Sequence, residues 1–137
     1  MRIKFVLISV MALALATGAA ADSVSPLKVV AYYFHATVRC VTCRTIESYS
    51  GEAIRQGFPE QLKNGSIEWR PVNVQLPENR HFIRNFRLFT RSLVLVKVRN
   101  GKEQEWRNLE QVWDLVRDKG RFLKYVQDNV KSYLGDR

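Results

Sequence analysis

Hydrophobic and polar positions change their spacing several times along the chain, and each change marks an expected element. Residues 27–34 form a run rich in β-branched and aromatic residues, with Lys28 as its one charged position, which predicts a buried strand. Over residues 40–56, apolar side chains recur at three- and four-residue steps, which predicts a helix. Gly57 and Pro59 interrupt that pattern, and the Asn64-Gly65 pair predicts a turn before the next element.

The second half of the chain alternates between the same two periods. Residues 67–74 predict a second strand, and Pro77 can begin a helix. The apolar side of this helix is expected to carry Phe82, Ile83, Phe86 and Phe89. Residues 92–98 give the clearest strand of the chain, since almost every position is apolar and β-branched or leucine.

The Asn100-Gly101 pair is the strongest short signal for a hairpin. Residues 102–107 are therefore expected to form a fourth strand, antiparallel to the third. Asn108 is a plausible N-cap for a helix, which we expect to break at Gly120 before a final helix begins.

The order of elements is β-α-β-α-β-β-α, which indicates an α/β fold. The first two strands are joined through a helix, so they should run parallel, with a right-handed crossover. The hairpin then adds two antiparallel strands. We expect a four-stranded mixed sheet with helices on both faces, which is the minimal thioredoxin arrangement.

The first residues resemble a secretory signal rather than part of the fold. Arg2 and Lys4 give a basic start, and residues 5–16 form an apolar run too short to span a bilayer comfortably. Ala19 and Ala21 fit the small-residue cleavage pattern. We expect a signal peptide over 1–21, one domain over 22–137, and export to a bacterial periplasm without stable membrane insertion after cleavage.

Composition and charge narrow the function classes. The chain has 137 residues and a formal net charge of +9, which falls to +7 when Arg2 and Lys4 leave with the signal. The 11% aromatic content fits a packed core rather than disorder. We expect no nucleic-acid partner, because an exported protein rarely meets one and no recognition motif appears. A monomer is expected.

The two cysteines, Cys40 and Cys43, lie three positions apart at the start of the predicted helix. A disulfide between them would close a very short loop and would remove little conformational entropy from the unfolded chain. The pair is therefore expected to contribute little to stability, and its spacing is reasonable for redox chemistry. Residues three apart share one helix face, and the helix N-terminus favours a thiolate. We expect Cys40 to be the attacking sulfur and Cys43 the resolving one.

The mature region resembles the thioredoxin superfamily in its strand 29–34, in the loop and helix start 39–44, and in the strand 92–96. Within it, residues 33–44 and 90–95 are similar to the small exported thioredoxin-like family known as ArsF, a nitroreductase subunit family. This resemblance implies an exported redox protein that works with a partner.

Three departures from ordinary thioredoxins limit what the resemblance implies. The Trp-Cys-Gly-Pro-Cys motif becomes residues 39–43 here, Arg-Cys-Val-Thr-Cys. The buried carboxylate expected six residues before the first cysteine is Phe34, so a base is missing unless His35 or Glu47 serves. The cis-proline of the family corresponds to Arg91, which we expect to follow a trans peptide bond.

Several residues around the pair are candidates for tuning or substrate contact. Arg39 and Arg44 flank the cysteines, and each either stabilises the Cys40 thiolate or is a solvated surface charge. Thr90 and Arg91 are expected near the cysteines, with Arg91 as charge partner, as anion-binding residue or in solvent. His35 is expected either to modulate proton transfer or simply to be hydrogen-bonded in its loop.

A second basic feature follows in the sequence. On a continued helix, Arg80, Arg84, Arg87 and Arg91 would lie on one side. This stripe is expected either to dock an acidic protein or to be a solvated face.

The sequence therefore predicts an exported thiol–disulfide oxidoreductase that needs no organic cofactor. Its partner would be a protein disulfide or dithiol, or a subunit of a redox complex. Two alternatives stay open: a non-catalytic subunit with an inert disulfide, and a protein that binds a soft metal ion or arsenite through two thiolates. We expect no metal site within the chain alone.

Overall fold

The computed structural model describes residues 26–135 of the chain. The predicted signal peptide, residues 1–21, lies outside the described residues. Within the described part, no helix combines the length and apolar character needed to cross a membrane.

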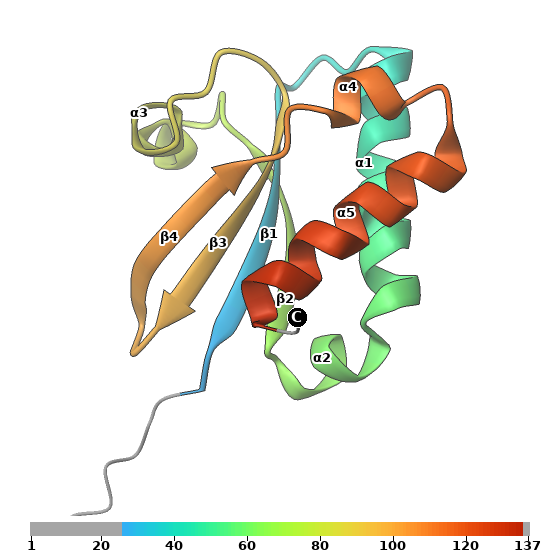
Figure 1. The fold of residues 1–137 in the computed structure, drawn as a ribbon. Helices are drawn as coiled ribbons and strands as arrows, with labels where there is room; N and C mark the ends of the chain where they lie inside the picture. The colour runs from blue at the N-terminus through green and yellow to red at the C-terminus, as the bar shows by residue number, and fades with distance from the viewer. Residues whose placement is uncertain (1–25, 136–137) are drawn as a thin grey trace, which may run out of the picture.

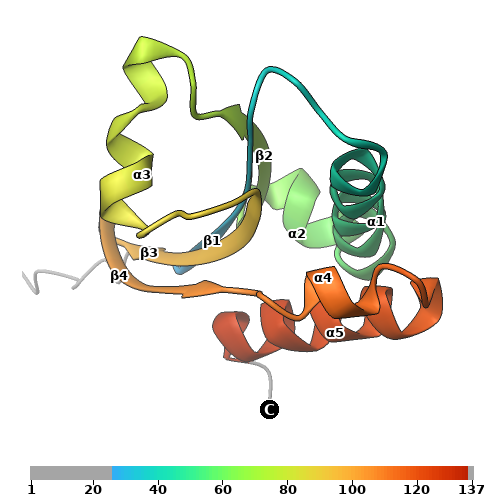
Figure 2. The same cartoon turned by 90° about the horizontal axis from the view of Figure 1, so that it is seen from above.

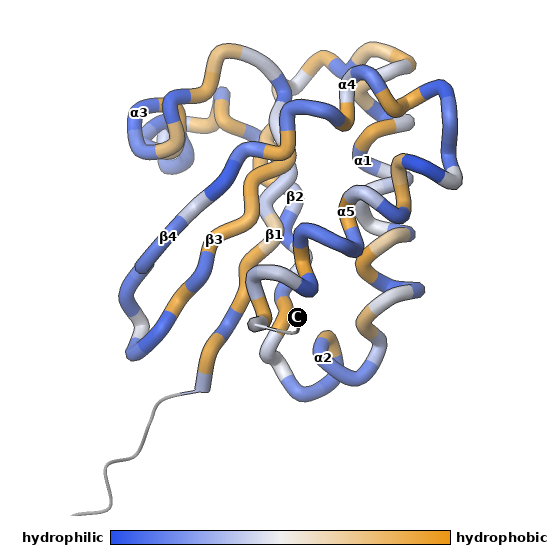
Figure 3. The backbone as a smooth tube through the Cα atoms, viewed as in Figure 1, coloured by the Kyte–Doolittle hydropathy of each residue, from blue (hydrophilic) through white to orange (hydrophobic). Residues whose placement is uncertain are grey.

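The centre of the molecule is a four-stranded mixed sheet with strand order β2-β1-β3-β4 (Figure 1). β1 (Lys28–His35) pairs in parallel with β2 (Ile67–Asn73) and antiparallel with β3 (Ser92–Arg99). β4 (Lys102–Asn108) pairs antiparallel with β3 and forms one edge. The predicted thioredoxin-like sheet is confirmed, with the central strands the most apolar ones and β4 largely hydrophilic (Figure 3).

The turn between β3 and β4 forms as its sequence predicts. Asn100 and Gly101 have φ values of 55° and 70°. Two successive positive φ angles are the mark of a two-residue type I′ hairpin turn, whose twist matches that of paired strands. The Asn-Gly pair therefore fixes where β4 begins.

One face of the sheet is covered by two long helices and two short ones (Figure 2). The long helices are α1 (Val41–Gly57) and α5 (Lys119–Leu134). The short ones are α2 (Pro59–Asn64) and α4 (Val112–Leu115). The larger hydrophobic cluster lies between these helices and the sheet.

The other face carries a shorter helical segment, made of the 3-10 turn η1 (Pro77–Asn79) and α3 (His81–Asn85). Phe86, just after α3, packs with Tyr32 and Phe34 of β1 in a second cluster. Because side chains alternate along a strand, Tyr33 instead joins the first cluster. Helices on both faces of the sheet were predicted, and this is confirmed.

The predicted helix after Pro77 is shorter than expected. α3 ends at Asn85, and Arg87 adopts a left-handed φ of 49°. The amide of Leu88 donates to the carbonyl of Ile83, and the amide of Arg87 to that of Arg84, which is the Schellman pattern of a helix end.

Two expectations built on a longer helix are therefore wrong. Arg80, Arg84, Arg87 and Arg91 do not form one continuous helical stripe, because the backbone turns before the last two. Phe89 does not lie on a buried apolar side, since its side chain is 99% exposed.

The helical end of the chain also differs from expectation. Asn108 is not an N-cap, because it belongs to β4 and pairs with Val94. The cap of the last helix is Asp118, whose Oδ1 accepts from the amide of Arg121 at 3.1 Å. Gly120 does not break a helix, since it lies in the first turn of α5. The sequence pattern also missed the short helix α2.

The aromatic cluster under α3 gives a prediction with a matched control. Phe86 is 1% exposed and Phe89 is 99% exposed, so the same substitution tests burial alone. Phe86→Ala should lower the free energy of unfolding by roughly 3–5 kcal/mol, because it leaves a cavity against β1. Phe89→Ala should leave it unchanged. Urea unfolding of the two oxidised variants measures both, and equal losses would contradict the packing described.

Candidate functional site

The two cysteines lie at the start of α1, after the short loop that follows β1. Cys40 is the N-cap of α1, with extended φ and ψ angles of −72° and 163°. Its sulfur accepts a hydrogen bond from the amide of Cys43 at 3.0 Å. That amide is one of the donors that a helix start leaves without a partner inside the helix. The sequence therefore sets the Cys40 sulfur directly at the positive end of the helix dipole.

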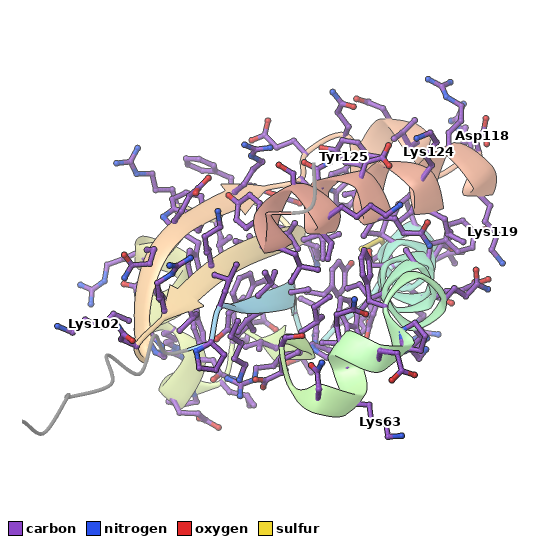
Figure 4. All side chains as sticks on the ribbon, turned by 60° about the horizontal axis from the view of Figure 1, so that its bottom comes forward. Lys63, Lys102, Asp118, Lys119, Lys124 and Tyr125 are labelled. Carbon is purple, nitrogen blue, oxygen red and sulfur yellow. A yellow bond between two sulfur atoms is a disulfide. The ribbon has the colours of Figure 1, made fainter. Side chains whose placement is uncertain are left out.

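Cys40 and Cys43 are joined by a disulfide with an S–S distance of 2.09 Å and a Cα–Cα distance of 5.1 Å. The bond is the yellow link beside α1 in Figure 4. The residue Cys40 is exposed, whereas Cys43 is only 2% exposed. An incoming sulfur can thus reach Cys40, while Cys43 lies behind it.

Tyr33 supports the cysteines from the sheet. Its hydroxyl donates to the carbonyl of Cys43 at 2.7 Å. Burial, together with the nearby carboxylate of Glu47, raises the pKa of Tyr33 to about 12. Tyr33 therefore remains protonated and remains a donor at neutral pH. It ties the first turn of α1 to β1, a contact that the strand pattern of residues 27–34 does not indicate.

Phe34 occupies the position, six residues before Cys40, at which thioredoxins have a buried carboxylate. Phe34 points to the α3 face of the sheet, where it stacks with Tyr32 and packs on Phe86. The side chain of β1 that reaches Cys43 is Tyr33 instead. A carboxylate near the cysteines comes from α1 itself, because Glu47 lies one helical turn after Cys43.

Arg39, His35 and Glu47 form a connected polar cluster before the helix. Nη1 of Arg39 donates to Glu47 in a part-buried ion pair. Nη2 of Arg39 lies 2.7 Å from Nε2 of His35. Since a guanidinium can only donate, Nε2 of His35 accepts, and its Nδ1 is left to donate to the carbonyl of Ala36 at 3.0 Å. The contacts of Arg39 thus go to Glu47 and His35.

The loop before β3 carries Thr90 and Arg91 to the same end of the sheet. The carbonyl of Arg91 accepts from Nε1 of Trp113 at 3.1 Å, and Nη2 of Arg91 lies 3.4 Å from the carbonyl of Val38. The peptide bond before Arg91 is trans, as expected. Arg91 therefore lies beside the loop that carries Cys40, held from α4 by Trp113.

The remaining candidates lie at the surface. Arg44 is exposed on α1, next to Ser48 in a shallow polar groove that Arg39 and Glu47 also line. Arg80 just before α3, Arg84 within it and Arg87 after it are also exposed. No ion pair involves these four arginines in the described range 26–135.

The donor set within the chain is small. In the part of the chain that the structure describes, no three His, Cys, Asp or Glu side chains gather as metal ligands would. The two thiolates of a reduced Cys40–Cys43 pair are the ligands that this end of α1 offers.

Comparison with known proteins gives structural neighbours only. No protein-family model and no curated protein sequence matches the chain. Among solved structures, it is similar to thioredoxin from Trypanosoma brucei brucei, with 20% identity, a TM-score of 0.44, and coverage of 79% of this chain and 80% of the other. Fasciola hepatica thioredoxin shows 20% identity, a TM-score of 0.41, and coverage of 69% and 81%.

A thioredoxin variant from Entamoeba histolytica is likewise similar, with 22% identity, a TM-score of 0.42, and coverage of 74% of this chain and 81% of the other. The fold assignment does not depend on these values. It rests on the strand order β2-β1-β3-β4, the antiparallel placement of β3, and the cysteine pair at the start of the helix that follows β1. The chain has a thioredoxin-like fold with its two cysteines at disulfide distance.

Tyr33 gives a prediction about pH. Tyr33→Phe should lower the free energy of unfolding of the oxidised protein by about 1 kcal/mol at neutral pH, because the Cys43 carbonyl loses its donor. Between pH 10 and 12 the unfolded chain loses the Tyr33 proton first, so the wild type should lose stability as pH rises. The variant should lose less over this range in urea unfolding. Two curves that stay parallel would contradict the assignment.

Proposed function

We propose that this protein is a thiol–disulfide oxidoreductase that exchanges two electrons through Cys40 and Cys43. The observation that carries the proposal is the bond from the Cys43 amide to the sulfur of Cys40, an exposed residue at a helix N-terminus. A donor aimed at the sulfur, together with the helix dipole, stabilises the thiolate over the thiol. A stabilised thiolate makes the reduced form more favourable and the disulfide more oxidising.

The reaction needs only the two sulfurs and a partner disulfide or dithiol. In the reducing direction, the Cys40 thiolate attacks one sulfur of the partner disulfide and forms a mixed disulfide, while the other partner sulfur leaves as a thiolate. Cys43 then loses its proton and attacks the Cys40 sulfur, which releases the second partner thiolate. The protein ends with the Cys40–Cys43 disulfide and the partner gains two electrons. The oxidising direction is the reverse.

Two groups were expected to take the Cys43 proton, and their contacts favour Glu47. Glu47 lies one turn along α1, and its carboxylate is held by Arg39. His35 accepts from the same guanidinium through Nε2 and donates through Nδ1, so neither ring nitrogen is free to take a proton. Because Arg39 bridges both groups, we propose that it positions them rather than pairing with the Cys40 thiolate.

The partner is proposed to be an acidic protein, a disulfide or dithiol substrate or another subunit of a redox complex. Arg80, Arg84 and Arg87 leave unpaired positive charge on the α3 side in the described range. Long-range attraction between opposite charges raises the rate at which partners meet. The resemblance to a nitroreductase subunit family supports the redox-complex form of this proposal.

Serine variants of the two cysteines test the proposal. Cys43→Ser should accumulate a mixed disulfide with a thiol-reactive protein substrate such as insulin, because the resolving sulfur is gone. Cys40→Ser should form none and should lose insulin reduction, since Cys43 is only 2% exposed. Gel shifts without reductant and insulin-reduction turnover measure both. Equal trapping by the two variants would contradict the proposed roles.

Two further measurements on the wild-type protein separate the alternatives. A very low reduction potential of the wild-type pair with no turnover would support a docking subunit with an inert disulfide. Tight stoichiometric uptake of zinc, Cu(I) or arsenite by the reduced chain would support a thiolate binding protein.

We also propose export, on the strength of the basic, apolar and small-residue pattern of residues 1–21. When the full chain is made in a bacterium, the product should appear in the periplasm with its first residue near Asp22. Intact mass measurement checks this. A full-length chain retained in the cytoplasm would contradict it.

A further inference from the structure

A groove of about 270 Å³ runs along the loop that joins β1 to α1, on the α3 side of the sheet. His35 at the end of β1 and Ala36 at the start of that loop line it on one side, and Thr90 and Arg91 line it from the loop before β3. The Arg91 guanidinium also reaches the carbonyl of Val38, two residues before Cys40. The groove therefore borders the start of the loop that leads to Cys40, and Arg91 connects its lining to that loop.

Most of the hydrogen-bond donors of the Arg91 guanidinium have no acceptor within the described part of the chain. Its guanidinium makes a single hydrogen bond, the 3.4 Å contact with Val38, and its Nε is buried without an acceptor in the part of the chain the structure describes. A guanidinium has five N–H donors, and burying a donor without an acceptor is unfavourable. No acidic side chain lines the groove within residues 26–135, so the charge of Arg91 is not neutralised there.

The walls of the groove are mostly apolar. They are formed by Phe34, Val74, Ile83, Leu88 and Phe89. Phe89 is almost fully exposed and Ile83 is partly exposed, so two of these walls also face solvent. An apolar wall beside one unneutralised cation suits a ligand that joins an apolar group to an anion.

We propose that this groove, the Arg91 groove, makes the enzyme selective for disulfides and thiols that carry a carboxylate beside an apolar or aromatic group. The carboxylate accepts from Arg91, and the apolar group lies against Phe89 and Leu88. The inference rests on the proposed redox function and adds its substrate class. Arg91 is then a specificity-determining residue that binds substrate, placed in the loop where the related fold has a proline.

Two aryl disulfides test this with the reduced protein, freed of reductant. One is dithiobis(nitrobenzoate), which carries a carboxylate on each ring, and the other is dipyridyl disulfide, which carries none. In both reactions Cys40 attacks one sulfur and releases one aryl thiolate. Cys43 then attacks Cys40 and releases the second, so the protein is oxidised as the disulfide gains two electrons. The released coloured thiols give the rate constants.

Arg91→Gln should slow the reaction with the carboxylated disulfide by about tenfold, because a charge-assisted hydrogen bond is lost. Its rate with dipyridyl disulfide should stay within about twofold of wild type. Arg91→Lys should recover part of the loss, since it keeps the charge. Arg121→Gln is the matched control, because it removes one exposed charge from outside the groove and should leave both rate constants unchanged.

A second variant does not depend on the folding of Arg91→Gln. Phe89→Ser changes a side chain that is already in solvent, and it should slow both aryl disulfides to a similar degree by removing their shared apolar wall. Unchanged rates for Phe89→Ser would overturn the groove as the place of the aryl group.

The remaining outcomes separate this inference from the function on which it rests. If Arg91→Gln slows both disulfides equally, Arg91 acts on the reactivity of Cys40 and the specificity proposal fails. If it slows neither, the carboxylate does not bind there and the proposal also fails. A wild-type protein that reacts with neither disulfide would instead contradict the redox function itself.

Discussion

The structure depends on one local constraint, the start of α1 immediately after a buried strand. Because β1 is fixed on both sides by β2 and β3, its last residues have little freedom, and the loop must deliver Cys40 to a single place. The helix then begins with the Cys43 amide donating to that sulfur, and the Tyr33 hydroxyl holds the first turn through the Cys43 carbonyl. The proposed chemistry depends on this placement, since Cys40 is an exposed residue and its sulfur has a backbone donor that favours a thiolate.

The residues around Cys40 and Cys43 are arranged differently from what a position-by-position comparison with the thioredoxin sequence pattern suggests. Phe34 packs in the cluster on the α3 face, and the carboxylate nearest to the cysteines in the sequence is Glu47 of α1. Its charge is balanced by Arg39, which also orients His35. An arginine next to a cysteine in the sequence is therefore not by itself the charge partner of the thiolate, because its guanidinium can form an ion pair with a carboxylate instead, as Arg39 does with Glu47.

The sequence was sufficient for the parts of the fold that depend on local signals. The buried run of β1, the Asn100-Gly101 turn and the helical period after Cys40 each have one strong physical cause, and each element formed as predicted. The helix after Pro77 was predicted to be too long. Its end is set by the left-handed conformation of Arg87, and an arginine in the sequence does not indicate that conformation. The Tyr33 bond and the position of Glu47 were equally hidden, since both depend on how β1 and α1 pack.

Arg91 shows how one residue can change the role of a conserved position in a fold. A proline there offers a rigid backbone and no donor, so a substrate could meet it only through shape and backbone contacts. With arginine the peptide bond is trans and the loop is anchored through Trp113, while Arg91 also lines a groove that carries no acidic side chain in the described range. The cost of a poorly paired guanidinium is offset only when an anion occupies the groove. In the proposed groove, selectivity then arises because the Arg91 guanidinium lacks an acceptor before substrate binds. A carboxylate provides that acceptor, whereas a neutral substrate does not.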